Sequence, residues 1–214
     1  SPVLLLVFDP RTVVVVVNTV SLVLFVLVVV KNRTHLRVRE ITPISIAGLA
    51  GVPVGVYVLD TVSAGALRVA ITVLILALTA LMALNVRKRV PSAGLVGLGV
   101  GFTVSLLINA TGIGGPLIVL YVLSRGWSRN AVRASLALYF LVIETAGVAG
   151  YVVAGLLTEE RIALVLITAL PLVMGFWLAT YLVGRMNEAV FRRAVLSVIA
   201  VTSVIVLARE VATL

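Results

Sequence analysis

The chain has 214 residues, of which 62% are hydrophobic and 12% are charged, and its mean hydropathy is +1.25. Soluble domains carry about 25% charged residues, so this composition excludes an ordinary soluble globule and indicates an integral membrane protein. The chain has no cysteine, and His35 is its sole histidine. Disulfides and thiolate chemistry are therefore excluded, and a histidine-based metal site or catalytic triad is disfavoured.

The net charge of +9 comes from basic residues in short loops between apolar runs, where the positive-inside rule places them. The sequence has no basic face interleaved with aromatic residues, which binding to single-stranded nucleic acid would need. We therefore expect a multi-pass protein of the plasma membrane that has the lipid bilayer as its partner and does not bind nucleic acid.

Six apolar runs with at most one charge each suit helices that cross a bilayer, for which about 20 residues are needed. They cover residues 12–30, 41–59, 66–84, 134–154, 162–184 and 194–208, and the last extends back towards Glu188. Arg68 stands near the start of the third run, and Glu144 stands in the middle of the fourth. The predicted fold class is an all-α integral membrane protein.

A further uncharged stretch, residues 90–124, is interrupted by the segment INATGIGGPLIVLYV at residues 108–122. Glycine and proline are the strongest breakers of regular structure, so we expect two helices, over 93–108 and 116–124. At roughly 1.5 Å per residue these helices are about 24 and about 13 Å long. The hydrocarbon core is about 30 Å thick, so neither the second piece nor the opening residues 2–8 can cross alone.

The charges of the loops favour a layout in which residues 93–124 enter and leave the membrane on one side. If these residues crossed once, the basic loop 124–133 would lie outside and the acidic loop 155–161 inside, against the positive-inside rule. A return to the same side places both loops as the rule expects, in agreement with the basic loops 31–40 and 85–92. We predict that residues 93–124 form a re-entrant hairpin of two part-helices.

An internal repeat is visible at two places in the chain. GVPVGVYVLDTVSAGALRVAI (51–71) aligns with GFWLATYLVGRMNEAVFRRAV (175–195), and residues 1–13 resemble residues 115–132 with a small insertion. The predicted layout gives the two copies opposite orientations, and inverted repeats with broken helices are typical of transporters. The copies are predicted to cover residues 1–88, which lack their first hairpin arm, and residues 89–214, and together to form one membrane domain.

The glycine break has the residues of an anion site. Gly115 is a suitable N-cap and Pro116 a suitable first residue of the short helix, so the amides of residues 114–118 are expected to point into the break. A helix start carries about half a positive charge, and its free amides bind anions. Gly112 suits a left-handed cap of the preceding helix. The predicted substrate-binding residues are Asn109, Thr111, Gly112, Gly114, Gly115 and Pro116; the alternative is that the glycines only allow close helix packing.

Polar residues inside the apolar runs are further candidates. Ionisable residues at membrane depth are functional candidates by default, and Glu144 is a candidate proton carrier or, alternatively, a structural partner of an arginine or a backbone amide. The candidate pathway-lining residues are Asn18, Thr19, Ser21 and Ser105, for which hydrogen bonding between helices is the alternative.

Three arginines lie in the basic loop after the break, Arg125, Arg129 and Arg133. They are placed to attract anions to an inner vestibule. The positive-inside rule alone also accounts for their position, and we rank that explanation first.

Two blocks of the chain resemble the TauE/SafE sulfite exporter family: ATGIGGPLIVLYVLSRGWSRNAVRASLALYFLVIETAGVAGYVVAGLL (110–157) and the block 41–84, with GLAGVPVGVYVL. The shared signature is a glycine cluster, then proline, an apolar stretch, a loop and a helix that ends in glycines. The resemblance implies a transporter of sulfite, sulfonates and related anions, coupled to an ion gradient, with a cradle at Gly112, Gly114, Gly115 and Pro116. As a departure, the family's first glycine cluster would precede Pro2.

Together with this resemblance, the sequence predicts a multi-pass exporter of a small sulfur-containing oxyanion, of the sulfite or organosulfonate class, coupled to H⁺ or Na⁺. The alternatives are a transporter or channel for another small anion or an organic acid, or a membrane assembly subunit without transport. An enzyme would need a nucleophile–base pair or a metal constellation. We expect no catalytic residue, metal or cofactor, and a homo-oligomer is compatible with the sequence.

Overall fold

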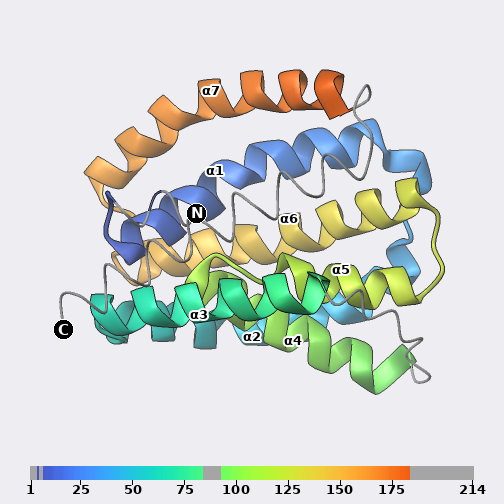
Figure 1. Ribbon diagram of the computed structural model, residues 1–214, viewed down its shortest axis with the longest axis horizontal. Helices are drawn as coiled ribbons and strands as arrows, with labels where there is room; N and C mark the ends of the chain where they lie inside the picture. Colours follow the sequence, from blue (N-terminus) through green and yellow to red (C-terminus); the bar gives the residue numbers. More distant parts are fainter. Residues whose placement is uncertain (1–3, 5–6, 84–92, 184–214) are drawn as a thin grey trace.

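The computed structural model describes residues 4, 7–83 and 93–183, and the regular elements in these residues are helices (Figure 1). They are α1 (Pro10–Lys31), the 3-10 turn η2 (Arg33–His35), α2 (Val38–Thr61), α3 (Ala64–Ala83), α4 (Ala93–Thr111), α5 (Gly115–Ser124), α6 (Arg129–Val153) and α7 (Glu159–Val183). The predicted all-α class is confirmed for this part of the chain. The predicted run at 194–208 lies outside the described residues.

Five helices are long and apolar enough to cross a membrane, namely α1, α2, α4, α6 and α7. The predicted runs between residues 12 and 184 correspond, to within a few residues, to α1, α2, α3, α6 and α7. The outward face of α7 is apolar, with Leu166, Leu170, Met174 and Trp177 exposed. Large exposed apolar surfaces of this kind mark membrane or protein contacts, in agreement with a multi-pass membrane protein.

Helix α4 continues to Thr111, three residues beyond its predicted end at residue 108. Its 19 residues give a length of about 28 Å, whereas α5 is only about 15 Å long. By length alone α4 can therefore cross a membrane, and α5 cannot. The predicted end was therefore three residues too early, although Gly112, the predicted cap, directly follows the observed end.

Helices α2 and α4 pack at close range because glycines line their contact. A Cβ atom on Gly55 would lie 2.6 Å from the Leu106 carbonyl oxygen, and a Cβ on Gly51 would collide with the Phe102 carbonyl. Small residues allow helix backbones to approach in this way inside membranes. The contact holds α4, with the polar residues near its end, inside the bundle.

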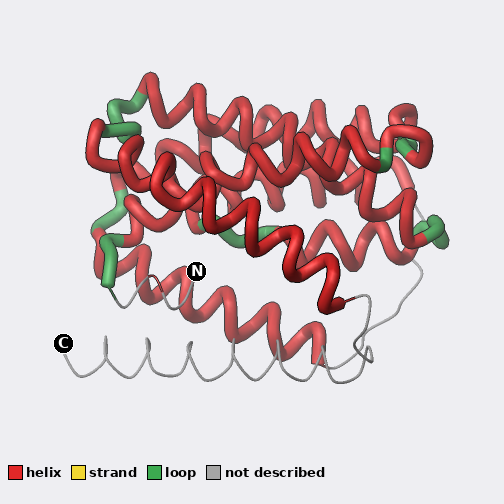
Figure 2. Tube along the Cα trace, turned by 90° about the horizontal axis from the view of Figure 1, so that it is seen from above, coloured by secondary structure: helices red, strands yellow, loops and turns green. Residues whose placement is uncertain are grey.

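Helix α5 folds back along α4 and ends where α4 begins (Figure 1). Tyr121, near the end of α5, lies against Gly97, near the start of α4, where an added Cβ would be 3.1 Å from the tyrosine ring. Most loops gather at the two ends of the bundle, while the loop between α4 and α5 lies near its middle (Figure 2). The glycine break is therefore far from either end of the bundle.

Candidate functional site

The end of α4 is capped by Gly112, the first residue of the break. Gly112 has a φ of +70°, a left-handed conformation that glycine adopts without the cost of a side chain. Its amide donates to the Ile108 carbonyl at 2.8 Å. The predicted left-handed cap at this position is confirmed.

The start of α5 lies one residue earlier than predicted. Gly114 is the N-cap, and Gly115 and Pro116 are the first two residues of the helix. The prediction of Gly115 as the N-cap and Pro116 as the first residue was wrong by one position. Proline is tolerated at either place because the amide that it lacks has no acceptor within the first turn.

The carbonyl groups at the end of α4 are paired by side chains from two other helices. Asn18 of α1 donates through Nδ2 to the Ile108 carbonyl at 3.0 Å and to Tyr151 Oη at 2.9 Å. Tyr151 of α6 donates in turn to the Asn109 carbonyl at 3.0 Å. Asn18 and Tyr151 are buried, so these bonds replace the water that an exposed helix end would have.

The Thr111 side chain binds the backbone of the same helix end. Its hydroxyl donates to the Leu107 carbonyl at 2.7 Å and accepts from the Ile113 amide at 3.3 Å. The threonine therefore stabilises the turn out of α4, and its hydroxyl is engaged by the backbone.

The first turn of α5 has no such pairing. Within the described residues no side chain caps it, and the Leu117 amide donates to the Gly114 carbonyl at 3.2 Å. Pro116 has no amide hydrogen. The amides of Gly114 and Gly115 form no hydrogen bond within the described part of the chain. The predicted cradle over residues 114–118 is therefore narrower than expected and consists of these two amides.

The three glycines of the break have different surroundings. Gly112 needs its positive φ, and a Cβ on Gly114 would lie 2.7 Å from Ile108 Cγ1 and 2.8 Å from the Val104 carbonyl oxygen. Both positions therefore require glycine for structural reasons. A Cβ on Gly115 would meet only Phe140 Cζ, at 3.9 Å, which is an ordinary contact. Packing against the described residues does not explain the glycine at position 115.

Polar side chains are also buried on α4 and α6. Three of their oxygen atoms, Ser105 Oγ and Asn109 Oδ1 of α4 and Glu144 Oε2 of α6, have no hydrogen-bond partner in the described part of the chain. Asn109 Nδ2 donates to the Ser105 carbonyl at 2.9 Å, which turns Oδ1 away from the helix. A Cβ on Gly147 would collide with this Oδ1, so α4 and α6 touch here.

Glu144 shares a face of α6 with Gly147 and Tyr151, because residues three and seven positions apart lie on one side of a helix. Tyr139 and Tyr151, on either side of Glu144 along α6, donate to the carbonyls of Gly101 and Asn109 at 2.7 and 3.0 Å. Glu144 therefore lies along the part of α4 that carries Ser105 and Asn109. It is 5% exposed.

The family model of the sulfite exporter TauE/SafE matches residues 1–206 of the chain. The chain belongs to the TauE/SafE family. The comparisons with curated proteins and with solved structures gave no match. Membership makes this TauE/SafE protein a multi-pass membrane transporter of the sulfite exporter class, which agrees with its five membrane-length helices.

The structure of the TauE/SafE protein separates the predicted site residues into two groups. Gly112, Gly114, Gly115 and Pro116 form the break itself. Ser105 and Asn109 of α4 and Glu144 of α6 instead carry buried oxygen atoms that have no hydrogen-bond partner in the described residues. Among the candidates on α1, Asn18 bonds to α4 and α6, Thr19 donates to the Val15 carbonyl of its own helix at 2.6 Å, and Ser21 is half-buried.

Two residues of this site were missed in the sequence, Gly147 and Tyr151. Both belong to the segment ETAGVAGY, in which Glu144, Gly147 and Tyr151 recur at helical spacing on one face. This spacing is the signal that would have joined them to Glu144. Within the described residues, no three histidine, aspartate or glutamate side chains gather as metal ligands would.

Proposed function

We propose that this TauE/SafE protein exports a small sulfur-containing oxyanion, of the sulfite or organosulfonate class, across the plasma membrane. The anion is held by the Gly114 and Gly115 amides at the start of α5. One observation carries the proposal: the Ile108 and Asn109 carbonyls near the end of α4 have side-chain partners, whereas these two amides have no partner in the described residues. Amides at a helix start bind anions readily.

The proposed topology is a re-entrant hairpin of α4 and α5 within two inverted repeats, over residues 1–88 and 89–214. The loop charges support it, and so does the return of α5 to the end of the bundle where α4 begins. The repeat alignment places Asp9 on Ser128, and both cap the helices that follow, α1 and α6. These two equivalent helices lie side by side and hold the broken end of α4 together.

The proposed transport is coupled to an ion through Glu144. A buried carboxylate with no partner is costly, and within the described residues Glu144 has neither an ion pair nor a hydrogen bond. A proton on Glu144 neutralises the buried carboxylate and so removes this cost. This favours H⁺ over Na⁺ as the coupling ion, since Na⁺ needs a fuller shell of oxygen ligands.

A transporter of another small anion or of an organic acid is the second candidate, because backbone amides recognise charge and size and not sulfur. An anion channel differs from a carrier in that its flux does not saturate and is not driven uphill by a second ion. A homo-oligomer is a further prediction, for which the apolar outward face of α7 offers a surface.

The test of the cradle is the uptake of radiolabelled sulfite into proteoliposomes by Gly115→Val and Gly115→Ala proteins. We expect valine to reduce flux to the background of empty liposomes and alanine to reduce it in part, because the side chain shields the amides. Stability should be nearly unchanged, since a Cβ at this position meets only Phe140 at 3.9 Å.

The matched control is Gly175→Val on α7, where an added Cβ has no described neighbour within 4 Å. This variant should transport sulfite like the unmodified protein. Full flux in folded Gly115→Val protein would exclude the cradle, and competition of sulfite flux by phosphate or acetate but not by methanesulfonate would favour the second candidate.

The test of coupling is sulfite accumulation driven by a pH gradient in Glu144→Gln protein. One coupled proton supports about tenfold accumulation per pH unit, and we expect the variant to lose this accumulation while it retains flux down a sulfite gradient. Glu159→Gln, which changes an exposed acid at the start of α7, is the control. Accumulation that persists in Glu144→Gln, or that follows a sodium gradient, would contradict a proton carried on Glu144.

A further inference from the structure

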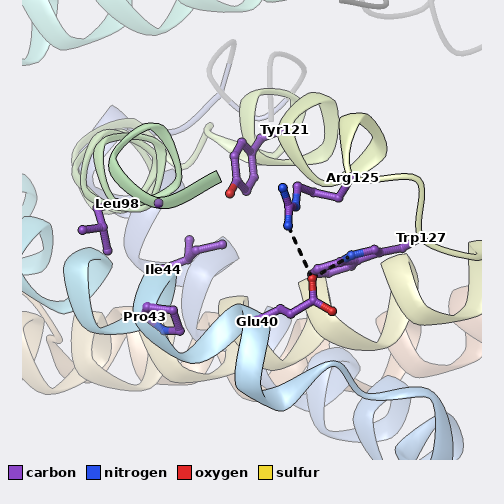
Figure 3. A pocket seen from close by; sticks show the side chains of 8 residues that line it. Glu40, Pro43, Ile44, Leu98, Tyr121, Arg125 and Trp127 are labelled. Atoms are coloured by element: carbon purple, nitrogen blue, oxygen red, sulfur yellow. Dashed lines mark hydrogen bonds and ion pairs between the residues drawn. The ribbon is translucent and has the colours of Figure 1, made fainter. Parts of the chain in front are cut away.

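A cavity of about 280 Å³ lies at the end of the bundle where α4 begins and α5 ends (Figure 3). Its apolar wall includes Ile44 of α2 and Leu98 of α4, and Tyr121 of α5 lies above them. Its polar wall is formed by Glu40, Arg125 and Trp127. Pockets for drug-sized ligands begin at about 300 Å³, so this cavity suits a smaller molecule.

The Glu40 carboxylate accepts one hydrogen bond and forms two ion pairs. Trp127 Nε1 donates to Glu40 Oε2 at 3.1 Å, and Arg125 Nη2 lies 3.7 Å from the same oxygen. Arg37 Nη1 lies 3.5 Å from Glu40 Oε1. Figure 3 shows the Arg125 and Trp127 side chains pointing at one carboxylate from the same side. A guanidinium and an indole N–H together form a set of donors that fits any small oxyanion.

The two sides of this contact belong to different parts of the chain. Glu40 is in the first turn of α2, whereas Arg125 is the C-cap of α5 and Trp127 follows it before α6. Arg125 and the Gly115 amide therefore stand at opposite ends of α5, about 15 Å apart. An anion bound at Arg125 is one short helix away from the proposed cradle.

We propose that this cavity is an anion-binding vestibule, in which the Glu40 carboxylate occupies the place of the anionic group of the substrate. Sulfite or a short sulfonate displaces Glu40 from Arg125 and Trp127, and the apolar wall accommodates the organic part of a sulfonate. The ion pair is partly exposed, with 30% and 37% of the Arg125 and Glu40 side chains accessible, so it is weak enough to be displaced. The substrate class rests on the proposed function.

Arg133 is the control residue that distinguishes binding in this cavity from a general attraction of anions to a basic surface. It is exposed, near the start of α6, and it does not line the cavity. Diffuse attraction would depend on Arg133 as much as on Arg125, whereas a vestibule depends on Arg125 and not on Arg133.

The experiment measures methanesulfonate and sulfite binding to the purified protein in detergent through tryptophan fluorescence. The chain has two tryptophans, so a Trp177→Phe background makes Trp127 the reporter. In that background we expect Glu40→Gln to bind methanesulfonate about tenfold more tightly, because a like charge is removed. Arg125→Gln should bind about tenfold more weakly, and Arg133→Gln should bind like the background protein.

Equal weakening by Arg125→Gln and Arg133→Gln, or no gain of affinity in Glu40→Gln, overturns the vestibule. A glutamine at position 40 can still accept from Trp127, so loss of the fold is not expected, and circular dichroism of each variant checks this. The vestibule and the cradle can be tested separately, because Gly115→Val changes the proposed cradle and not the cavity. In Gly115→Val protein, the methanesulfonate affinity reported by Trp127 fluorescence should equal that of the background protein. Equal binding of chloride and methanesulfonate would contradict the proposed substrate class, but it would not contradict an anion site in this cavity.

Discussion

The two helix ends that meet at the glycine break, the end of α4 and the start of α5, are treated differently by the rest of the molecule. The Ile108 and Asn109 carbonyls near the end of α4 receive hydrogen bonds from Asn18 and Tyr151, side chains that are distant in the sequence. The two amides at the start of α5 have no partner among the described residues. Both ends lie in an apolar bundle, where unpaired backbone groups are costly.

This difference indicates which end of the break stabilises the fold and which end is available to bind an anion. A helix interruption that served packing alone would be expected to have both ends paired, because each unpaired buried group costs about 1–3 kcal/mol. The Gly114 and Gly115 amides, which have no partner in the described residues, are the groups that we propose to bind the anion. The account therefore predicts that changes at the carbonyl end affect stability, and that changes at the amide end affect transport.

The largest loss of stability is expected for Gly114→Ala. The added Cβ would lie 2.8 Å from the Val104 carbonyl oxygen, and backbone atoms cannot move away as a flexible side chain can. We expect the free energy of unfolding, measured by SDS titration, to fall by about 1–3 kcal/mol, with loss of transport. In the same titration, the free energy of unfolding should fall by much less for Gly115→Ala. An equal fall for the two variants would contradict the distinction between the two glycines.

A smaller loss is expected for Asn18→Leu, which removes the donor to the Ile108 carbonyl and to Tyr151. Double-mutant measurements on hydrogen bonds between membrane helices average about 0.6 kcal/mol, whereas a buried group left unpaired costs about 1–3 kcal/mol. We expect unfolding to become easier by about 1–2 kcal/mol. Sulfite flux per folded molecule should change little.

Tyr151→Phe tests the same hydrogen-bonded group through its other side chain, because it removes the hydroxyl and leaves the ring. It removes the donor to the Asn109 carbonyl and the acceptor of Asn18 Nδ2, so the free energy of unfolding should fall by about 1–2 kcal/mol, as in Asn18→Leu. If either variant abolished flux without a loss of stability, the carbonyl end would belong to the transport site, and the contrast between the two ends would be wrong.

Much of the fold could be predicted from the sequence, because membrane helices depend on local hydropathy. The apolar runs locate α1, α2, α3, α6 and α7 to within a few residues, and Gly112 was recognised as a cap from its place after an apolar run. Local hydropathy does not reveal that Asn18 and Tyr151 bind the Ile108 and Asn109 carbonyls near the end of α4. These partners are 90 and 42 residues away from the groups that they bind.

The site was harder to predict than the fold for the same reason. Asn109 stands next to the break in the sequence, but its side chain points to α6, where it meets Gly147. The side on which a polar residue of α4 faces depends on the register between α4 and α6, and local sequence does not contain that register. The pairing of Glu40 with Trp127, 87 residues apart, is a second example.

The most direct measurement for the central claim is the NMR spectrum of the ¹⁵N-glycine-labelled protein in lipid nanodiscs, with and without methanesulfonate. The Gly114 and Gly115 amide signals are assigned by their loss in the Gly114→Ala and Gly115→Ala proteins. The account predicts that both amide protons move downfield as the anion binds, while the Gly112 signal, whose amide already donates to Ile108, moves little. Unchanged Gly114 and Gly115 signals at saturating methanesulfonate would contradict the account.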